Sequence, residues 1–302
     1  MPKFKVILDT DIGDDIDDAI ALALLLNSDE VELLGVTTVF RNAFKRAEMA
    51  KYFITINGYD IPVYAGMDQP LKQDVSLIVP SEIKQREKID EYGKYLIPQY
   101  LPEMKDAKVE PGNAVDFLIK KVHEYPHEVI ILAVGPLTNI AMALTKDPSI
   151  IPLIREIRIM GGYPDCHYPE WNILCDPEAA AIVYQSNVNL YAVGLNVTLQ
   201  CELDSTRMKA LEKVSENGSK LLKTMLEKWF AHYRFKTPVM HDPLTAASIL
   251  MPCVVFERAP YYVDLDVKRA HTIKSENGNE VFCATSVDTN MFFKLLFERV
   301  FK

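Results

Sequence analysis

Short runs rich in β-branched residues alternate with segments of helical periodicity, and this alternation constrains the fold more than any other feature. The expected strands cover residues 4–9, 31–39, 128–134, 156–160 and 188–196. The expected helices cover residues 17–28, 43–57, 136–147 and 176–186. Strand–helix alternation predicts an α/β fold, with a mostly parallel sheet and helices on both faces. In such sheets ligands bind outside the carboxyl ends of the strands.

Two segments interrupt this rhythm. Residues 68–110 combine many charges with prolines at positions 70, 80, 98 and 102, which predicts an irregular or partly helical excursion. A long excursion within a compact domain often forms a lid or a binding loop. Residues 204–232 are typical of one or two long polar helices, with Gly218 as a candidate break. Because no internal repeat or low-complexity linker divides the chain, we expect a single domain over residues 1–302.

The charge balance argues against a nucleic-acid or membrane partner. The 302 residues carry a formal net charge of −9, and nearly half of them are apolar, which allows a sizeable core. The five cysteines are scattered without a CxxC pair, which favours a reducing compartment over a disulfide framework or a zinc site. We expect no signal peptide before the first expected strand, and no apolar run has the length of a membrane span. We therefore expect a cytoplasmic protein.

An acidic cluster separates the first expected strand from the first expected helix. Its six aspartates lie within ten residues: Asp9, Asp11, Asp14, Asp15, Asp17 and Asp18. Carboxylates this close repel one another and are costly to desolvate. Acidic residues cap helix N-termini, but capping accounts for only one or two of the six. An all-oxygen cluster suits a hard cation, Ca²⁺ or Mg²⁺, so the sequence predicts a metal site.

The motif DTDIGDDIDDA resembles the signature D-x-D-x-G-x-D-D-A of the inosine–uridine-preferring nucleoside hydrolases. Matched from both ends, it places the family's first two aspartates on Asp9 and Asp11 and its closing pair on Asp17 and Asp18. The turn is two residues longer here, and it contains Asp14 and Asp15, whose roles stay open. Further segments resemble family blocks in the same order: 37–43, 133–141, 158–162, 169–180 and 241–247. The resemblance runs from about residue 4 to 250, and residues 287–300 look like the final helix of the family.

This resemblance implies an open Rossmann-like fold and hydrolysis of the N-glycosidic bond of ribonucleosides to ribose and free base. The implied calcium ligands are Asp11, Asp18, the backbone carbonyl of Val134, and Asp242. The implied substrate-binding residues are Asp17, Asn42, Met160, Glu170 and Asn172. Asp11 would be the base that activates water, and His241 the acid that protonates the leaving base. The family also forms dimers and tetramers, so a homodimer or homotetramer is expected.

The residues suit this chemistry. Glycosidic cleavage passes through a cationic, oxocarbenium-like ribosyl state, which a nest of carboxylates would stabilise. Calcium can hold two ribose hydroxyls and a water together, but it acidifies water less than zinc does, so a nearby base is needed. A histidine with an unperturbed pKa of ~6.5 can donate a proton near neutrality.

The chain departs from the family pattern near the substrate. The loop 163–169 is short and lacks the expected asparagine, which Asp165 or His167 would have to replace. The family's His-Gly-x-Asp-Gly-Leu segment has no equivalent in 71–110. Arg41 stands where a glycine usually precedes the asparagine. The base preference therefore stays open.

Some of these polar residues could have purely structural roles. Asp176 and Asp242 each precede a proline, so either could cap a helix, and Asn42 could be a plain turn residue. One alternative function is a non-catalytic calcium- or ribose-binding protein on the same fold. A second is a haloacid-dehalogenase-like phosphotransferase, in which Asp9 would be the nucleophile.

Overall fold

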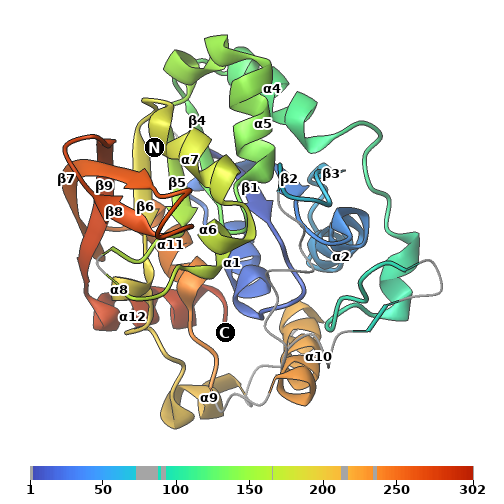
Figure 1. Ribbon diagram of the computed structural model, residues 1–302. Coiled ribbons are helices and arrows are strands. Elements are labelled where there is room, and N and C mark those ends of the chain that lie inside the picture. The colour runs from blue at the N-terminus through green and yellow to red at the C-terminus, as the bar shows by residue number, and fades with distance from the viewer. Residues whose placement is uncertain are drawn as a thin grey trace.

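The computed structural model describes residues 3–72, 88–89, 93–164, 166–211, 217–233 and 237–301. Within this part of the chain, a nine-stranded sheet has the order β3-β2-β1-β4-β5-β6-β9-β7-β8 (Figure 1). The strands are β1 (Phe4–Thr10), β2 (Val31–Thr38), β3 (Val63–Ala65), β4 (Val129–Ala133), β5 (Glu156–Met160), β6 (Leu190–Val193), β7 (Val254–Val263), β8 (Thr272–Lys274) and β9 (Asn279–Val287). All neighbours from β3 to β9 pair in parallel, whereas β7 is antiparallel to β8 and β9. The predicted α/β class with a mostly parallel sheet is confirmed.

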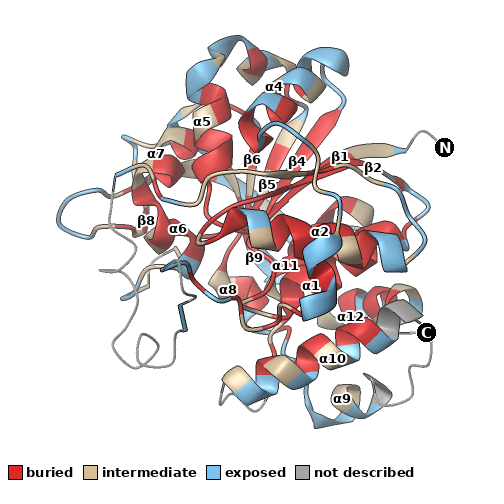
Figure 2. Cartoon of the chain, turned by 90° about the vertical axis from the view of Figure 1, so that its right-hand side faces the viewer, coloured by how far each residue is buried: buried red, intermediate tan, exposed pale blue. Residues whose placement is uncertain are grey.

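Helices cover both faces of the sheet, as predicted (Figure 2). One face carries α1 (Asp17–Leu26), α2 (Ala43–Ile56), α10 (Asn217–His232), α11 (His241–Leu250) and α12 (Thr289–Arg299). The other carries α4 (Ala114–Glu124), α5 (Thr138–Lys146) and α7 (Pro177–Gln185). Shorter elements connect them: α6 (Trp171–Cys175), α8 (Leu195–Thr198), α9 (Ser205–Leu211), η2 (Pro102–Asp106) and η3 (Pro148–Leu153).

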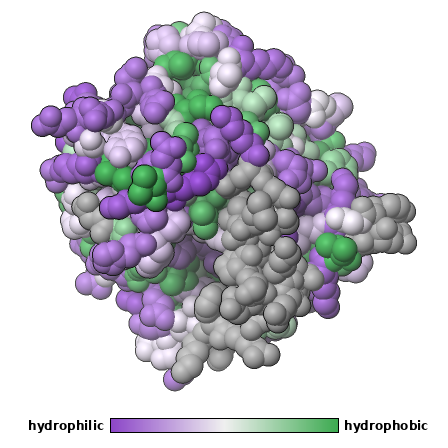
Figure 3. Space-filling view, viewed as in Figure 1, coloured by the Kyte–Doolittle hydropathy of each residue, from purple (hydrophilic) through white to green (hydrophobic). Residues whose placement is uncertain are grey.

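The centre of the sheet is buried on both sides, which explains the near-continuous apolar sequence of its strands. The last five residues of β1 and all five of β4 are buried. All ten residues of α1 are buried as well, because this helix lies between the sheet and other helices, among them α11. Two of those ten are Asp17 and Asp18, so the chain places carboxylates in its core. On the side of the molecule that Figure 3 shows, by contrast, most of the coloured surface is hydrophilic.

Two predicted boundaries were wrong. The strand expected over 188–196 ends at Val193, and α8 begins at Leu195 after the extended residue Gly194. Gly218 is not a break, because it lies in the first turn of α10. The residues between α9 and α10 lie outside the described part, as do 73–87 and 90–92 of the predicted excursion. None of the helices in the described ranges is long and apolar enough to cross a membrane.

Candidate functional site

A cavity of about 340 Å³ lies at the carboxyl ends of β1, β4 and β5, where ligands bind in open parallel sheets. Its lining comprises Asp11, Asp14, Asp15, Asp17, Asp18, Arg41, Tyr95, Val134, Met160, Glu170, Trp171, Asn172, Leu195, Tyr233, His241 and Asp242. All the predicted site residues except Asn42 are in this lining. Segments that are far apart in the sequence therefore converge at one place, as the motif order predicted.

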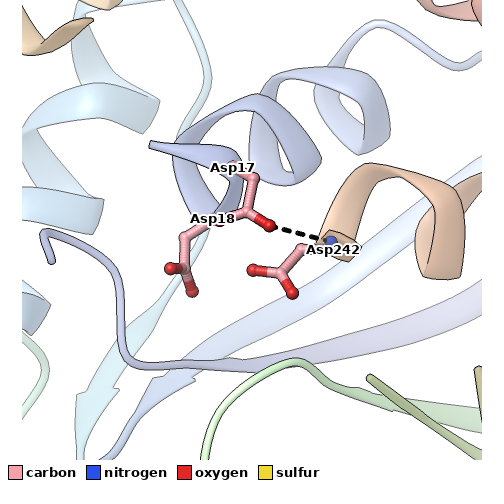
Figure 4. A group of neighbouring side chains, drawn as sticks. All are labelled: Asp17, Asp18 and Asp242. Carbon is pink, nitrogen blue, oxygen red and sulfur yellow. Dashed lines mark hydrogen bonds between the residues drawn. The ribbon is translucent and has the colours of Figure 1, made fainter. Parts of the chain in front are cut away.

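Three carboxylates form the floor of the cavity (Figure 4). Asp17 and Asp18 lie in the first turn of α1, and Asp242 lies in the first turn of α11. One oxygen from each lies within 4.8 Å of the others, and the backbone N–H of Asp242 donates to Asp17 Oδ2 at 3.1 Å. Burial, and then repulsion from neighbouring carboxylates, raises the pKa of all three well above its usual value. The two helix N-termini offset only part of that cost.

The capping interpretation is wrong for Asp242 and confirmed for Asp176. The N-cap residue of α11 is Met240, and Asp242 is already the second helical residue, so its side chain points to the other carboxylates. Asp176 caps α7, because its Oδ1 accepts from the N–H of Ala179 at 3.1 Å. Asp242 is thus available as a ligand, whereas Asp176 is occupied by a structural contact.

The two aspartates at the end of β1 have different environments. Asp9 is fully buried, and its Oδ1 accepts from the Thr37 hydroxyl at 2.5 Å and from Asn139 Nδ2 at 2.7 Å. It does not line the cavity, which argues against a phosphotransferase nucleophile at this position. Asp11 does line the cavity. Burial raises its pKa to about 7, against the opposing effect of Arg46.

The residues around this floor fit a hard divalent cation. Asp18 accepts from the Thr10 hydroxyl, which fixes its orientation. The carbonyl oxygen of Val134 accepts from Asn172 Nδ2 at 2.9 Å, and its second lone pair is available for a further partner. The donor set is thus three or four carboxylates and a carbonyl, all oxygen ligands, as Ca²⁺ and Mg²⁺ prefer.

Glu170 and Asn172 form a second polar group in the same cavity. The Glu170 carboxylate accepts from the N–H groups of Asn172, Ile173 and Gly162 at 2.7, 3.1 and 3.3 Å, which fixes it at the start of α6. Burial raises its pKa to about 7 despite these bonds. The Asn172 amide also donates to the carbonyl of Met160 at 3.1 Å. Both side chains are therefore held in place.

His241 lines the cavity as predicted, but its surroundings differ from the expectation. Its Nδ1 lies 2.7 Å from the Thr198 hydroxyl, and burial lowers its pKa to about 4. The ring is therefore neutral near pH 7. It can present an N–H to a leaving group, but the ordinary pKa assumed from the sequence does not apply.

Asn42 is held outside the described cavity lining. The backbone of Asn42 is left-handed, with φ of 75°, and the side-chain Nδ2 donates to the carbonyl of Tyr95 at 2.9 Å. The preceding residue, Arg41, lines the cavity instead. Of the two candidates for the missing loop asparagine, His167 is exposed and does not line the cavity, and Asp165 lies outside the described residues.

The longer aspartate turn has a structural role that sequence reasoning missed. Asp14 pairs with Arg46 at 2.8 Å and accepts from the Tyr95 hydroxyl at 2.8 Å. Gln99 Nε2 donates to the backbone carbonyls of Asp14 and Asp15 at 3.0 and 2.7 Å. These contacts attach the end of the 68–110 excursion to the turn. A search for a counter-charge in the expected helix 43–57 could have raised Arg46 as a candidate, since Arg46 and Lys51 are the basic residues that are buried in this helix.

Arg46 of α2 supplies the positive charge that balances this turn. It is fully buried, and its guanidinium also donates to the carbonyls of Phe40 at 2.7 Å, of Ile12 at 3.0 Å, and of Asp11. The acidic cluster is thus divided. Asp14 is balanced by an arginine, whereas the described structure shows no such partner for Asp17, Asp18 and Asp242.

Comparisons with known proteins agree with this geometry. A family model described as inosine-uridine preferring nucleoside hydrolase matches residues 6–294. Uridine nucleosidase 1 of Arabidopsis thaliana is 33% identical over 264 residues, which cover 82% of this chain and 74% of that protein. An inosine-uridine preferring nucleoside hydrolase of Crithidia fasciculata is 32% identical, over 89% of this chain and 85% of that protein. A purine-preferring ribonucleoside hydrolase from Gardnerella vaginalis has a similar structure, with a TM-score of 0.81, 27% identity and 98% coverage of both chains.

Proposed function

The chain belongs to the inosine-uridine preferring nucleoside hydrolase family, and we propose that it performs this family's reaction with a calcium ion on the carboxylate floor of the cavity. The enzyme cleaves ribonucleosides to ribose and free base, as its relatives do. The observation that carries the calcium proposal is the set of three buried carboxylates whose oxygens lie within 4.8 Å of one another.

The chemistry of the donor set favours calcium over magnesium. Calcium accepts about six to eight oxygen ligands in flexible geometry, whereas magnesium requires near-ideal octahedral geometry and usually keeps several waters. A site built from several carboxylates and a backbone carbonyl is therefore more typical of calcium. The ligands would be Asp18, Asp242, Asp11 and the carbonyl of Val134. Burial and then repulsion from neighbouring carboxylates raise the pKa of these carboxylates, and a bound ion would offset that repulsion.

The ion would supply a positive charge that holds ribose hydroxyls and water at the floor of the cavity. Asp11 accepts the proton of the attacking water, because it lies at the cavity end of β1 beside the floor. Asp17 accepts a hydrogen bond from a ribose hydroxyl. The carboxylates together stabilise the positive charge that develops on the ribosyl group.

The opposite side of the ribose would contact Glu170 and Asn172. Both are held by backbone contacts, so they bind the sugar at little further entropic cost. The carbonyl of Met160 lies beside them. His241 presents an N–H to the leaving base from its neutral ring, with Thr198 fixing the orientation of that ring.

Cell location and assembly are further parts of the proposal. A cytoplasmic location is supported by the cysteines, all described and none in a disulfide. A homodimer or homotetramer is the assembly that the resemblance to the family implies.

The test is release of free base from inosine, uridine, cytidine, adenosine and guanosine, with and without a calcium chelator. We expect release that the chelator abolishes and that calcium restores better than magnesium. Hydrolysis that survives complete metal removal would refute the calcium proposal. Tight ribose binding without release from any nucleoside would favour the non-catalytic alternative for this chain.

A further inference from the structure

The loop between β2 and α2 has an unusual backbone. Phe40, Arg41 and Asn42 are three consecutive non-glycine residues with positive φ, at 70°, 41° and 75°. Each such residue costs of the order of 1–2 kcal/mol, so the conformation persists only where its surroundings fix it. Here the N–H groups of Phe40 and Arg41 donate to the carbonyls of Met67 and Asp68 at 2.7 and 2.8 Å. Strain of this kind concentrates at functional sites.

The consequence of this backbone is the position of the Arg41 side chain. Its guanidinium carbon lies 3.9 Å from the centroid of the Tyr95 ring, which is a close cation–π stack. Tyr95 is itself fixed twice, because its hydroxyl donates to Asp14 and its carbonyl accepts from Asn42. The guanidinium is therefore held at the cavity wall by a chain of contacts that leads back to the elongated aspartate turn.

The cavity has an acidic floor and a less buried rim. Asp17, Asp18 and Asp242 are at most 4% exposed, whereas Arg41 is half-buried and Trp171 is 37% exposed. Among the described lining residues, Arg41 is the one that carries a permanent positive charge. A ribonucleoside whose sugar occupies the floor directs its base toward the rim. The permanent cation is thus on the side of the leaving group.

We propose that Arg41 binds the nucleobase through an oxo group and stabilises the negative charge that the base acquires as it leaves. This inference rests on the proposed function. In the reaction the C1′–N bond breaks and its electron pair stays on the base nitrogen. The water oxygen bonds to C1′, and its proton goes to Asp11. The base leaves as an anion delocalised onto its oxo oxygen, where Arg41 donates hydrogen bonds, and it then takes a proton from solvent.

Arg41 would also set base preference. A guanidinium only donates hydrogen bonds, so it matches the oxo group of hypoxanthine and not the amino group of adenine. A site built to pair a polar group of the substrate discriminates strongly against an analogue that lacks it. Inosine and adenosine differ only at this edge of the base, in the substituent on C6 and the proton on N1, which makes their ratio the readout of the contact.

The experiment compares Arg41→Gln and Arg41→Lys with the wild type on inosine, adenosine and p-nitrophenyl riboside. Nitrophenolate is a stable anion at neutral pH and needs little stabilisation. We expect Arg41→Gln to lower kcat/KM for inosine by about 10²-fold, for adenosine by less, and for the nitrophenyl riboside by under about threefold. Arg41→Lys should recover part of the loss, because it keeps the charge. Arg258→Gln, an exposed arginine on β7, is the matched control and should behave like the wild type.

The outcomes separate this inference from the proposed function. Equal losses of Arg41→Gln on inosine and the nitrophenyl riboside, or an unchanged inosine-to-adenosine ratio, would overturn the role of Arg41. A wild type that hydrolyses none of the three substrates would refute the proposed function instead. Should Arg41→Gln fail to fold, the same ratios measured with Arg41→Lys decide, because the lysine lacks the planar fork that matches an oxo group.

Discussion

Replacing Arg46 by methionine should destabilise the protein strongly. The side chain is fully buried, and it pairs with Asp14 and donates to the carbonyls of Phe40, Asp11 and Ile12. Methionine keeps much of the volume but none of the donors. Breaking a buried ion pair by removing one partner costs about 3–5 kcal/mol, because the other charge is left uncompensated. We expect the free energy of unfolding to fall by about this amount.

Urea denaturation at saturating calcium measures the effect, with Arg299→Met as the matched control. Arg299 pairs with the exposed carboxylate of Glu30 at 2.9 Å, so the same substitution there should cost less than about 1 kcal/mol. In an Asp14→Asn background, Arg46→Met should cost about 1–3 kcal/mol less than in the wild type, because the asparagine carries no charge that the loss of Arg46 would leave unpaired. A loss from Arg46→Met no larger than that from Arg299→Met, or no coupling to Asp14, would contradict the structural role of the Arg46–Asp14 pair.

Three further predictions concern the site. Asp242→Asn should abolish calcium binding, as followed by calorimetry, and lower kcat by about 10²–10³-fold; tight calcium binding by this variant would exclude Asp242 as a ligand. Folding raises the pKa of Asp17, Asp18 and Asp242, so the folded metal-free protein binds more protons than the unfolded chain, and its stability should fall as pH rises through the raised values. Thermal unfolding of chelated protein should therefore occur at a lower temperature at pH 8 than at pH 5.5, and saturating calcium should reduce the difference; a metal-free protein that is more stable at pH 8 would refute this reasoning. Thr198→Val removes the hydroxyl beside His241 Nδ1 and should lower turnover of inosine about tenfold but spare p-nitrophenyl riboside, whereas equal effects on both would exclude a leaving-group role for His241.

The fold and most of the cavity lining were accessible from the sequence for different physical reasons. Strand–helix alternation is a local signal, and it predicted the sheet because each buried strand must be apolar on both sides. The site residues were accessible through motifs that resemble those of the family in the same order. Their convergence follows from parallel topology, since Asp9 of β1 lies in register with Ala133 of β4.

The rest depends on contacts between segments that no local pattern links. Asn42 has the residue type expected at its position, but the left-handed loop turns its amide to Tyr95 and brings Arg41 to the cavity. The pKa of His241 depends on burial, which the sequence HDPLTAA does not reveal. The strand prediction over 188–196 failed because Gly194 ends the strand and α8 follows at once.

The two extra residues of the aspartate turn explain how one acidic cluster can serve both structure and catalysis. Six carboxylates around one ion would exceed the charge that a divalent cation neutralises. Within the longer turn Asp14 pairs with Arg46, and Thr37 and Asn139 donate hydrogen bonds to Asp9 in the sheet. The floor consists of Asp17, Asp18 and Asp242, and Asp11 and Asp15 also line the cavity. The protein thus uses an arginine for the part of the cluster that must be rigid, and the proposed calcium for the part that must bind substrate.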